Sequence, residues 1–501
     1  MRMAARGSGG RAERPIAWPV TVPVARPSAV PAAVVPAPRG RGPTRVTGRP
    51  PGERGVRMPS AADHEQVLGD LLTASHTITL EELPDVVAEH VPRAGWPEVL
   101  IYVADLQQTV LSLLAPRTGD ASRRARGYPS ALRVDDSVAG RAFQLGRIVA
   151  DPDEAAGGQQ PRHRWWVPLL EGTERLGVAR VAADADIGDD AGAVKRLRGL
   201  AALLALLLAS KRSASDSYAR LVRRRGMNVA AEMAWRLMPQ HTLTTGRVLI
   251  SALMEPAYEV SGDAFDYGVA GEVVHLSLFD AMGHDTAAGL TATLALAAAR
   301  NHRRHQSGIL EAAEAIEAAL VEQFDGARYA TGVLAELNAR TGEFSWTNLG
   351  HLPPVVLRQG DTAFLHCPPA PPMGTGLGLS ATLCQTRLQP GDRLLLYTDG
   401  VTEARNRRGE EFGLARVTDF VARHQTASLP APETLRRLIL LHRRHHEGRL
   451  NDDATVLLLE WNGPTPYRSE DVETLLGLPD DTAHADSPRE AGQAPDADGM
   501  A

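Results

Sequence analysis

Residues 276–284 read Leu-Ser-Leu-Phe-Asp-Ala-Met-Gly-His, an apolar strand that ends at Asp280 and is followed by small residues. A sheet fixes the backbone of an aspartate at the end of a strand, so that its carboxylate projects from the sheet edge. Gly283 allows the chain to turn sharply beside this carboxylate. The stretch therefore predicts an acidic group held in a defined place, and the chain repeats the pattern.

Three further aspartates lie at strand ends or in tight turns. They are Asp263 in Gly262-Asp-Ala-Phe-Asp266, Asp399 in Leu394-Leu-Leu-Tyr-Thr-Asp-Gly400 and Asp452 in Leu450-Asn-Asp-Asp-Ala-Thr-Val456. Strand ends brought together concentrate negative charge, which is costly unless protons or cations neutralise it. Hard divalent ions with oxygen ligands, such as Mg²⁺ or Mn²⁺, satisfy such a cluster. One Asp-Gly pair is an ordinary turn, but four such positions in order predict a metal site.

Residues 241–462 surround these aspartates with alternating strands and helices, which predicts an α+β sandwich. The expected strands are 248–254, 273–279, 330–337, 344–349, 354–358, 393–397 and 454–460. The expected helices are 286–302, 308–323 and 432–445.

The ordered motifs of residues 227–461 resemble the SpoIIE-type branch of the PPM metal-dependent Ser/Thr protein phosphatases. The motifs are Ala230–Pro239, Pro256–Asp263, Asp280–His284, Thr347–Pro354, Met373-Gly374, Leu388–Asp392, Tyr397–Glu403 and Asn451–Thr455. This resemblance implies a β-sandwich flanked by helices, with two Mn²⁺ or Mg²⁺ ions. The residues that it implies as catalytic and metal-holding are Asp263, Asp280, Asp399 and Asp452, with the carbonyl of Ala281.

Three more aspartates are candidates for supporting positions around the metals. Asp453 is expected behind the metal-holding residues, and Asp266 in a helper or structural role. Asp285 either supports the site or caps the helix that begins at Thr286, and capping is the favoured interpretation. An arginine placed to grip phosphate, common in this branch, is not evident.

The implied reaction is the hydrolysis of phosphoserine or phosphothreonine by a metal-activated water. Two cations lower the pKa of a bridging water from about 15.7 towards neutrality and neutralise the charge that develops on the phosphoryl oxygens. The resemblance further implies a phosphorylated anti-sigma-factor antagonist as substrate, in bacterial sigma-factor regulation. The alternatives are a non-catalytic signalling module that keeps the fold, and a phosphatase of a small phosphorylated metabolite.

Residues 61–190 predict a compact α/β unit that resembles a GAF sensor domain. The resemblance lies in Leu100–Val103, Ser137–Gly146 and Val167–Val178, and a PAS-like domain is the competing interpretation. Trp165 and Trp166 either line a ligand pocket or pack in the core. The sequence does not reveal the sensor's ligand.

Residues 191–240 are expected to be helical, because leucines recur at steps of three and four residues. These leucines are Leu197, Leu200, Leu204, Leu207 and Leu208. A helix between two domains predicts a coiled-coil connector, a homodimer and transmission of a signal to the phosphatase domain. A helix packed on its own domain is an equally open interpretation.

The 501-residue chain ends in two segments of opposite charge, both expected to be disordered. Residues 1–60 hold eleven Arg, two Glu and eleven Pro, whereas residues 463–501 hold nine acidic residues and two Arg. The acidic balance of the remaining chain argues against nucleic-acid binding as the main task. The longest apolar run, Gly199–Ala209, is shorter than the roughly 20 residues of a membrane span, and two cysteines fit a reducing cytoplasm.

Overall fold

The computed structural model describes residues 60–151, 163–183, 191–259, 262–426, 429–447, 450 and 452–466. The Arg/Pro-rich arm, nearly all of the acidic tail, Ser261 and Asn451 lie outside the described residues. By their contacts the described residues belong to one compact unit, which contains the following elements.

An antiparallel sheet of six strands organises the N-terminal part, in the order β3-β2-β1-β6-β5-β4. The strands are β1 (Glu98–Ala104), β2 (Val110–Leu114), β3 (Ala131–Arg133), β4 (Val149–Ala150), β5 (His163–Glu171) and β6 (Glu174–Ala183). The helices are α1 (Ala61–Ala74), α2 (Leu83–His90), α3 (Gly119–Ala125) and α4 (Val138–Leu145). A hairpin joins β5 to β6, and its Gly172 has a φ of 59°, which glycine adopts without steric cost.

Trp165 and Trp166 lie next to each other on β5, so their side chains point to opposite faces of the sheet. Trp165 packs into the apolar core shared with α1 and α2, and Trp166 packs into a second core with Phe143 of α4. Both side chains are buried, which confirms the core-packing interpretation. The GAF-like assignment of this part stays a prediction.

Three helices follow the sheet: α5 (Ala191–Arg212), α6 (Asp216–Val222) and α7 (Val229–Leu237). The five leucines of the predicted seam are buried in the same apolar core as α1, α2 and β1. Helix α5 therefore packs on the N-terminal part of its own chain, as one of the two interpretations predicted. The homodimer stays a prediction, and those leucines are already covered within one chain.

The C-terminal part is a sandwich of two antiparallel sheets. One sheet has the order β15-β12-β11-β10-β9 and the other β14-β13-β16-β17-β8-β7. The first contains β9 (Asp263–Ala270), β10 (Val273–Ala281), β11 (Ala330–Asn338), β12 (Glu343–Leu349) and β15 (Cys384–Arg387). The second contains β7 (Thr242–Thr244), β8 (Val248–Glu255), β13 (Val355–Arg358), β14 (Asp361–Phe364), β16 (Arg393–Tyr397) and β17 (Ala454–Trp461).

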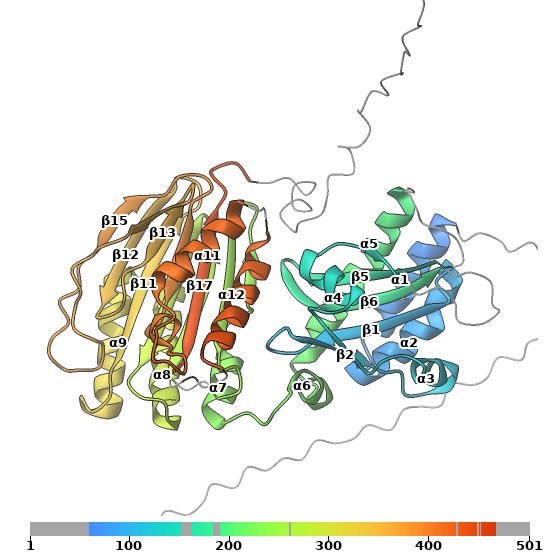
Figure 1. The fold of residues 1–501 in the computed structure, drawn as a ribbon, viewed down its shortest axis with the longest axis horizontal. Coiled ribbons are helices and arrows are strands. Elements are labelled where there is room, and N and C mark those ends of the chain that lie inside the picture. The colour runs from blue at the N-terminus through green and yellow to red at the C-terminus, as the bar shows by residue number, and fades with distance from the viewer. Residues whose placement is uncertain are drawn as a thin grey trace, which may run out of the picture. The chain divides into compact units, whose positions relative to one another are not determined.

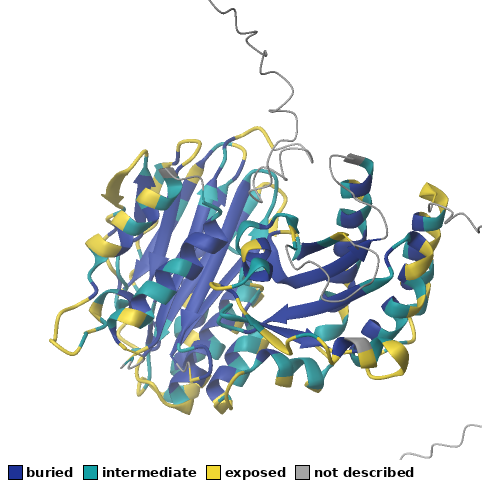
Figure 2. Cartoon of the chain, turned by 45° about the vertical axis from the view of Figure 1, so that its right-hand side comes forward, coloured by how far each residue is buried: buried dark blue, intermediate teal, exposed yellow. Residues whose placement is uncertain are grey.

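Helices cover both outer faces of this sandwich (Figure 1). Helices α8 (Thr286–Arg304) and α9 (Ile309–Phe324) pack on the five-stranded sheet. Helices α11 (Leu414–Thr426) and α12 (Ala431–His445) lie on the six-stranded sheet, and the short α10 (Asp399–Glu403) follows β16. Figure 2 shows the strands of both sheets as buried and exposed residues mainly on loops and outer helix surfaces. The predicted α+β architecture is confirmed.

The two cysteines, Cys367 and Cys384, are joined by a disulfide bond. Cys384 begins β15 at the edge of one sheet, and Cys367 follows β14 at the edge of the other. The bond therefore ties the two sheets at one side, which a reducing compartment does not favour. Within the described residues, every helix is too short or too polar to cross a membrane.

Candidate metal centre

Asp263 and Asp280 face each other across two neighbouring strands. Asp263 begins β9, Asp280 lies near the end of β10, and the two are direct partners in the antiparallel register. Residues opposite each other share one face of the sheet. This face looks towards the second sheet, because the Oδ2 atom of Asp263 accepts hydrogen bonds from the hydroxyls of Thr398 (2.8 Å) and Thr455 (2.5 Å).

The second sheet brings its aspartates to the same end of the sandwich. Asp399 follows β16, Asp453 precedes β17, and these two strands are paired. Asp453 is buried, and its Oδ2 atom accepts a hydrogen bond from the backbone N–H of Gly262 at 2.7 Å. It also accepts one from the N–H of Asp263 at 3.3 Å. One carboxylate of the second sheet therefore fixes the backbone that carries Asp263.

The charges of these carboxylates interact strongly. Burial raises the pKa of Asp280 to about 7, and neighbouring carboxylates contribute to the rise. Those carboxylates belong to Asp399, Asp452 and Asp453. Burial and then the charges of Asp280 and Asp453 also raise the pKa of Asp263 well above its usual range. A cation placed among them would relieve this repulsion.

The glycines beside the aspartates allow the close approach. A Cβ atom on Gly400 would lie 2.1 Å from the carbonyl oxygen of Asp453. A Cβ on Gly262 would lie 2.7 Å from the carbonyl oxygen of Ala281, the backbone group predicted to help hold a metal. Both glycines are therefore required by packing between the strand ends and not by a turn alone.

The donor set fits hard divalent ions, since it consists of carboxylate oxygens and a backbone carbonyl. In the described part of the chain, no three acidic, His or Cys side chains already converge as a finished ligand shell. Asp263 accepts hydrogen bonds from two threonine hydroxyls, and Asp453 accepts hydrogen bonds from backbone amides. Both threonine hydroxyls bond to the Oδ2 atom of Asp263, so its Oδ1 atom would remain for an ion while the threonines hold the carboxylate in place.

Asp452 is more exposed than Asp453, and its Oδ1 atom accepts a hydrogen bond from the next backbone N–H. It contributes to the raised pKa values of Asp280 and Asp399. The structure therefore brings Asp263, Asp280, Asp399 and Asp452 into one charged cluster with Asp453. The metal-holding role of each stays a prediction.

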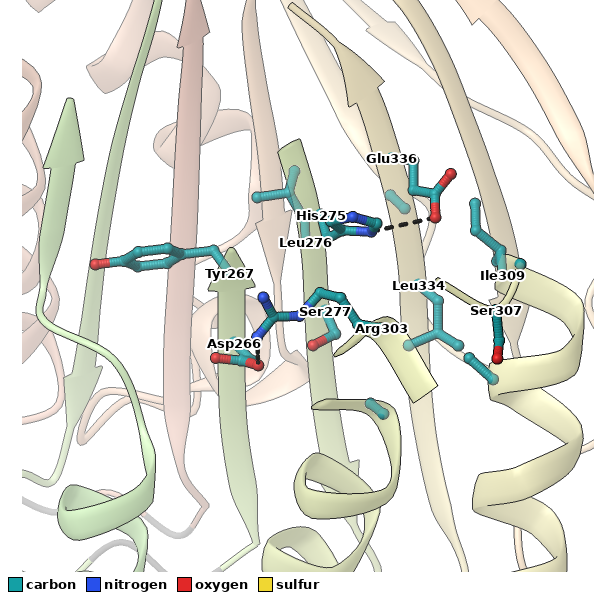
Figure 3. Close-up of a pocket in the computed structure, with 14 residues that line it drawn as sticks. Asp266, Tyr267, His275, Leu276, Ser277, Arg303, Ser307, Ile309, Leu334 and Glu336 are labelled. Atoms are coloured by element: carbon teal, nitrogen blue, oxygen red, sulfur yellow. Dashed lines mark hydrogen bonds and ion pairs between the residues drawn. The ribbon is translucent and has the colours of Figure 1, made fainter. Parts of the chain in front are cut away.

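Asp266 does not reach this cluster. It lies three residues after Asp263 on β9, so its side chain points to the opposite face of the sheet. There it is buried and forms ion pairs with Arg300 (2.6 Å) and Arg303 (2.9 Å) of α8. Figure 3 shows Asp266 and Arg303 among the side chains that line a small pocket of about 40 Å³. Asp266 therefore has the structural one of its two predicted roles, since it joins β9 to α8.

Asp285 caps helix α8, as the favoured interpretation predicted. Its Oδ1 atom accepts a hydrogen bond from the N–H of Ala288 at 2.8 Å. Its carboxylate also pairs with Arg328, whose Nη1 donates to the carbonyl of Met282 at 3.3 Å. The positively charged side chain of Arg328 therefore lies beside the turn that follows Asp280. The sequence pattern did not reveal this arginine.

The part of the chain that carries these aspartates is similar to a known protein family. Residues 270–462 match the family model described as stage II sporulation protein E (SpoIIE). This stretch is a SpoIIE-type domain. Asp280, Asp399, Asp452 and Asp453 lie inside the matched residues, and Asp263 lies just before them.

Two curated relatives and one solved structure are similar to the chain. Phosphoserine phosphatase RsbU of Bacillus subtilis (strain 168) is 26% identical over 220 residues, covering 42% of this chain and 62% of RsbU. Protein IcfG of Synechocystis is 26% identical over 142 residues, covering 28% of this chain and 22% of IcfG. The structure of the RsbU and RsbW domains of Rv1364c from Mycobacterium tuberculosis has 26% identity and a TM-score of 0.39, covering 44% of this chain and 63% of that one. The chain thus spans less than two thirds of the length of each curated relative.

Two histidines form hydrogen bonds that connect segments of this domain near the aspartates. The hydroxyl of Thr331 donates to Nδ1 of His351 (2.8 Å), and Nε2 of His351 donates to the carbonyl of Tyr397 (3.1 Å). His442 of α12 is fully buried, and its Nε2 donates to the carbonyl of Gly400 at 3.1 Å. His446, the residue after α12, is buried as well.

The residues missed next to the aspartates are Thr398 and Thr455. Each stands inside a motif that was recognised, directly before Asp399 or at the end of the Asp452-Asp453 segment. A buried hydroxyl requires a hydrogen-bond partner, and here both find the same carboxylate oxygen. The available signal was a threonine directly before Asp399 and another two positions after Asp453.

Proposed function

We propose that this protein is a metal-dependent protein serine/threonine phosphatase. The observation that carries the proposal is the cluster of Asp263, Asp280 and Asp399 with the Asp452-Asp453 pair, at the end of the sandwich in a SpoIIE-type domain. The name of the relative RsbU, phosphoserine phosphatase, supports the same reaction class.

In the proposed mechanism, Asp263, Asp280, Asp399, Asp452 and the carbonyl of Ala281 would hold two Mn²⁺ or Mg²⁺ ions. When bound, such ions supply an activated water and neutralise charge on a phosphoryl group. Neighbouring residues of the chain hold the proposed metal-binding groups in position. Thr398 and Thr455 orient the carboxylate of Asp263, and Asp453 fixes the backbone at Gly262.

The proposed substrate is a phosphoserine or phosphothreonine on a protein, of the anti-sigma-factor-antagonist class. This part of the proposal rests on the resemblance of the motifs to the SpoIIE-type phosphatases. The GAF-like domain is proposed to regulate the activity in response to a ligand of unknown identity. The phosphoprotein is distinguished from a small metabolite by comparing phosphate release from phosphorylated antagonist proteins and from sugar phosphates.

The central test replaces Asp280 by Asn. This change keeps the shape of the side chain and removes the charge that would hold a cation, so we expect Mn²⁺-dependent phosphate release to fall by roughly 100-fold or more. The fold should persist, because removal of a repelled carboxylate relieves unfavourable charge.

The measurement is hydrolysis of p-nitrophenyl phosphate and of a phosphoprotein at several Mn²⁺ concentrations. Asp266→Asn is not a suitable control, because its two arginines would lose their partner, whereas Asp361→Asn changes an exposed residue of β14. Unchanged hydrolysis by Asp280→Asn would contradict the proposed site. Absence of hydrolysis by the unaltered protein would favour the non-catalytic signalling module.

A further inference from the structure

A buried cluster of charges joins the N-terminal part of the compact unit to helix α12. Glu433 is fully buried, and its Oε2 atom accepts a hydrogen bond from Arg175 at 2.8 Å. Arg175 lies in the β5–β6 hairpin, is itself buried, and stacks over the ring of Phe143. An ion pair with both members buried needs nearly ideal partners, and removal of one member leaves an uncompensated charge.

Arg436 completes this cluster from the next turn of α12. It donates to Glu433 at 2.8 Å and to Asp135 of the N-terminal part at 2.7 Å. Its Nη1 also donates to the carbonyl of Gln108, in the β1–β2 turn, at 3.3 Å. Three segments of the N-terminal part therefore contact one turn of one helix.

The other end of α12 contacts the candidate metal centre. His442 lies nine residues after Glu433, which is about 13 Å along a helix. Its Nε2 donates to the carbonyl of Gly400, the residue after Asp399. The neighbouring Arg443 lies 3.8 Å from Glu255, which is paired with Ala454, directly after Asp453.

Besides Arg443 of α12, Glu255 is contacted by a residue of the N-terminal part. Gln107 of the β1–β2 turn donates to both carboxylate oxygens of Glu255, at 3.0 and 3.1 Å. Arg175 and Asp135 thus contact the first turns of helix α12. The end of the helix contacts Gly400, beside Asp399, and Glu255, which pairs with the residue after Asp453.

We propose that docking of the N-terminal part on Glu433 and Arg436 sets the position of α12, and that α12 sets the position of the Asp399 turn through His442. His442 is in this scheme a positioning residue. The inference rests on the proposed function for its effect on activity, but the mechanical coupling itself is independent of catalysis. In this proposal, a signal from the N-terminal part reaches the Asp399 turn through α12, in addition to the predicted route through the helices of residues 191–240.

The test uses the full chain and two variants of the docking contact. Arg175→Met removes the buried guanidinium at similar volume, and Asp135→Asn removes the charge of a partner that is 36% exposed, so at least one should fold. The control is Arg93→Met, which breaks an exposed ion pair with Asp70 in the same part of the chain.

We expect both variants to raise the Mn²⁺ concentration for half-maximal activity by roughly 2- to 30-fold. We also expect faster amide hydrogen exchange in residues 399–403 as well as in α12, with Arg93→Met resembling the unaltered protein. Faster exchange confined to α12, with residues 399–403 unchanged, would overturn the coupling.

A double variant tests the route through His442. His442→Leu removes the hydrogen bond to Gly400 and should reproduce the effects of Arg175→Met on exchange in residues 399–403. His442→Gln retains a donor and should restore much of the protection. If the route is correct, Arg175→Met adds little to His442→Leu, whereas full additivity would overturn it.

The two proposals fail in distinguishable ways. Absence of phosphatase activity in the unaltered protein would reject the proposed function, and the exchange measurements would still decide the coupling. Normal activity with unaltered exchange in both docking variants would reject the coupling alone.

Discussion

At the scale of single residues, the candidate site depends on how its carboxylates are held. Four of the aspartates in the cluster were evident from sequence, because they lie at strand ends or in tight turns. Their hydrogen-bond partners were not evident, because a hydroxyl such as that of Thr398 could bond to many neighbours. Only the packing of two sheets brings Thr398 and Thr455 to the same oxygen of Asp263.

Thr455 provides a test of this arrangement. Thr455→Val keeps the side-chain shape and removes a hydrogen bond to a buried carboxylate, worth about 1.5–3 kcal/mol. We expect reduced activity at limiting Mn²⁺, because Asp263 would lose one of the groups that orient it. Thr291→Val is the matched control, since this buried threonine bonds only within helix α8, to Ala287 at 2.8 Å. Equal activity of the two variants would show that the hydroxyl of Thr455 does not matter.

His351 predicts a dependence of stability on pH. Burial lowers its pKa from 6.5 to about 4 in the folded protein. The unfolded chain therefore binds a proton between pH 6.5 and 4 that the folded chain does not, and stability falls as the pH drops through this window. Between pH 7 and 5 the loss from this group is about 2 kcal/mol.

His351→Gln should remove that part of the acid sensitivity. The measurement is the free energy of unfolding in urea at pH 7 and pH 5, for the unaltered protein and the variant. His284→Gln is the control, because this histidine is exposed. The same decrease with pH in His351→Gln and in the unaltered protein would contradict the assignment.

At the scale of elements, the strands with apolar runs were predicted within one or two residues, whereas β9, α11 and three short edge strands were not. Strand β9 carries Asp263, Asp266 and Gly268, residues that disfavour strands. Its burial is possible because Arg300 and Arg303 of α8 neutralise Asp266. Those partners are about 35 positions away in the chain, so local pattern could not reveal them.

The α10 turn tests the close packing of two elements. Gly400→Ala would place a Cβ atom 2.1 Å from the carbonyl of Asp453, so the turn carrying Asp399 and the segment before β17 must separate. We expect a loss of most Mn²⁺-dependent activity, with a smaller fall in stability, measured by phosphate release and urea unfolding.

The control for this change is a glycine in open space. Gly69 lies in the exposed part of α1 with no atom near its potential Cβ, and Gly69→Ala should stabilise the protein by about 1 kcal/mol. Full activity of Gly400→Ala would mean that the strand ends tolerate separation and that the tight packing is not required for catalysis.

At the scale of the whole molecule, the disulfide connects the edges of the two sheets across 17 positions of sequence. Closing a loop of about this length restricts the unfolded chain and stabilises the folded one by about 3 kcal/mol. Reduction should therefore lower the free energy of unfolding by a similar amount, measured in urea with and without dithiothreitol. The Cys367→Ser/Cys384→Ser variant should not respond to the reductant, and an equal response of both proteins would contradict the prediction.

The burial of the α5 leucines decides where the molecule can be divided. A cut at residue 190 leaves the apolar side of α5 attached to the C-terminal piece without its cover. The segment Arg224-Arg225-Gly226, between α6 and α7, is exposed and offers trypsin two arginines. Cleavage there keeps α5 with the strands that shield it, so this point, 34 residues beyond the boundary drawn from composition, is the natural place to separate the two halves for expression.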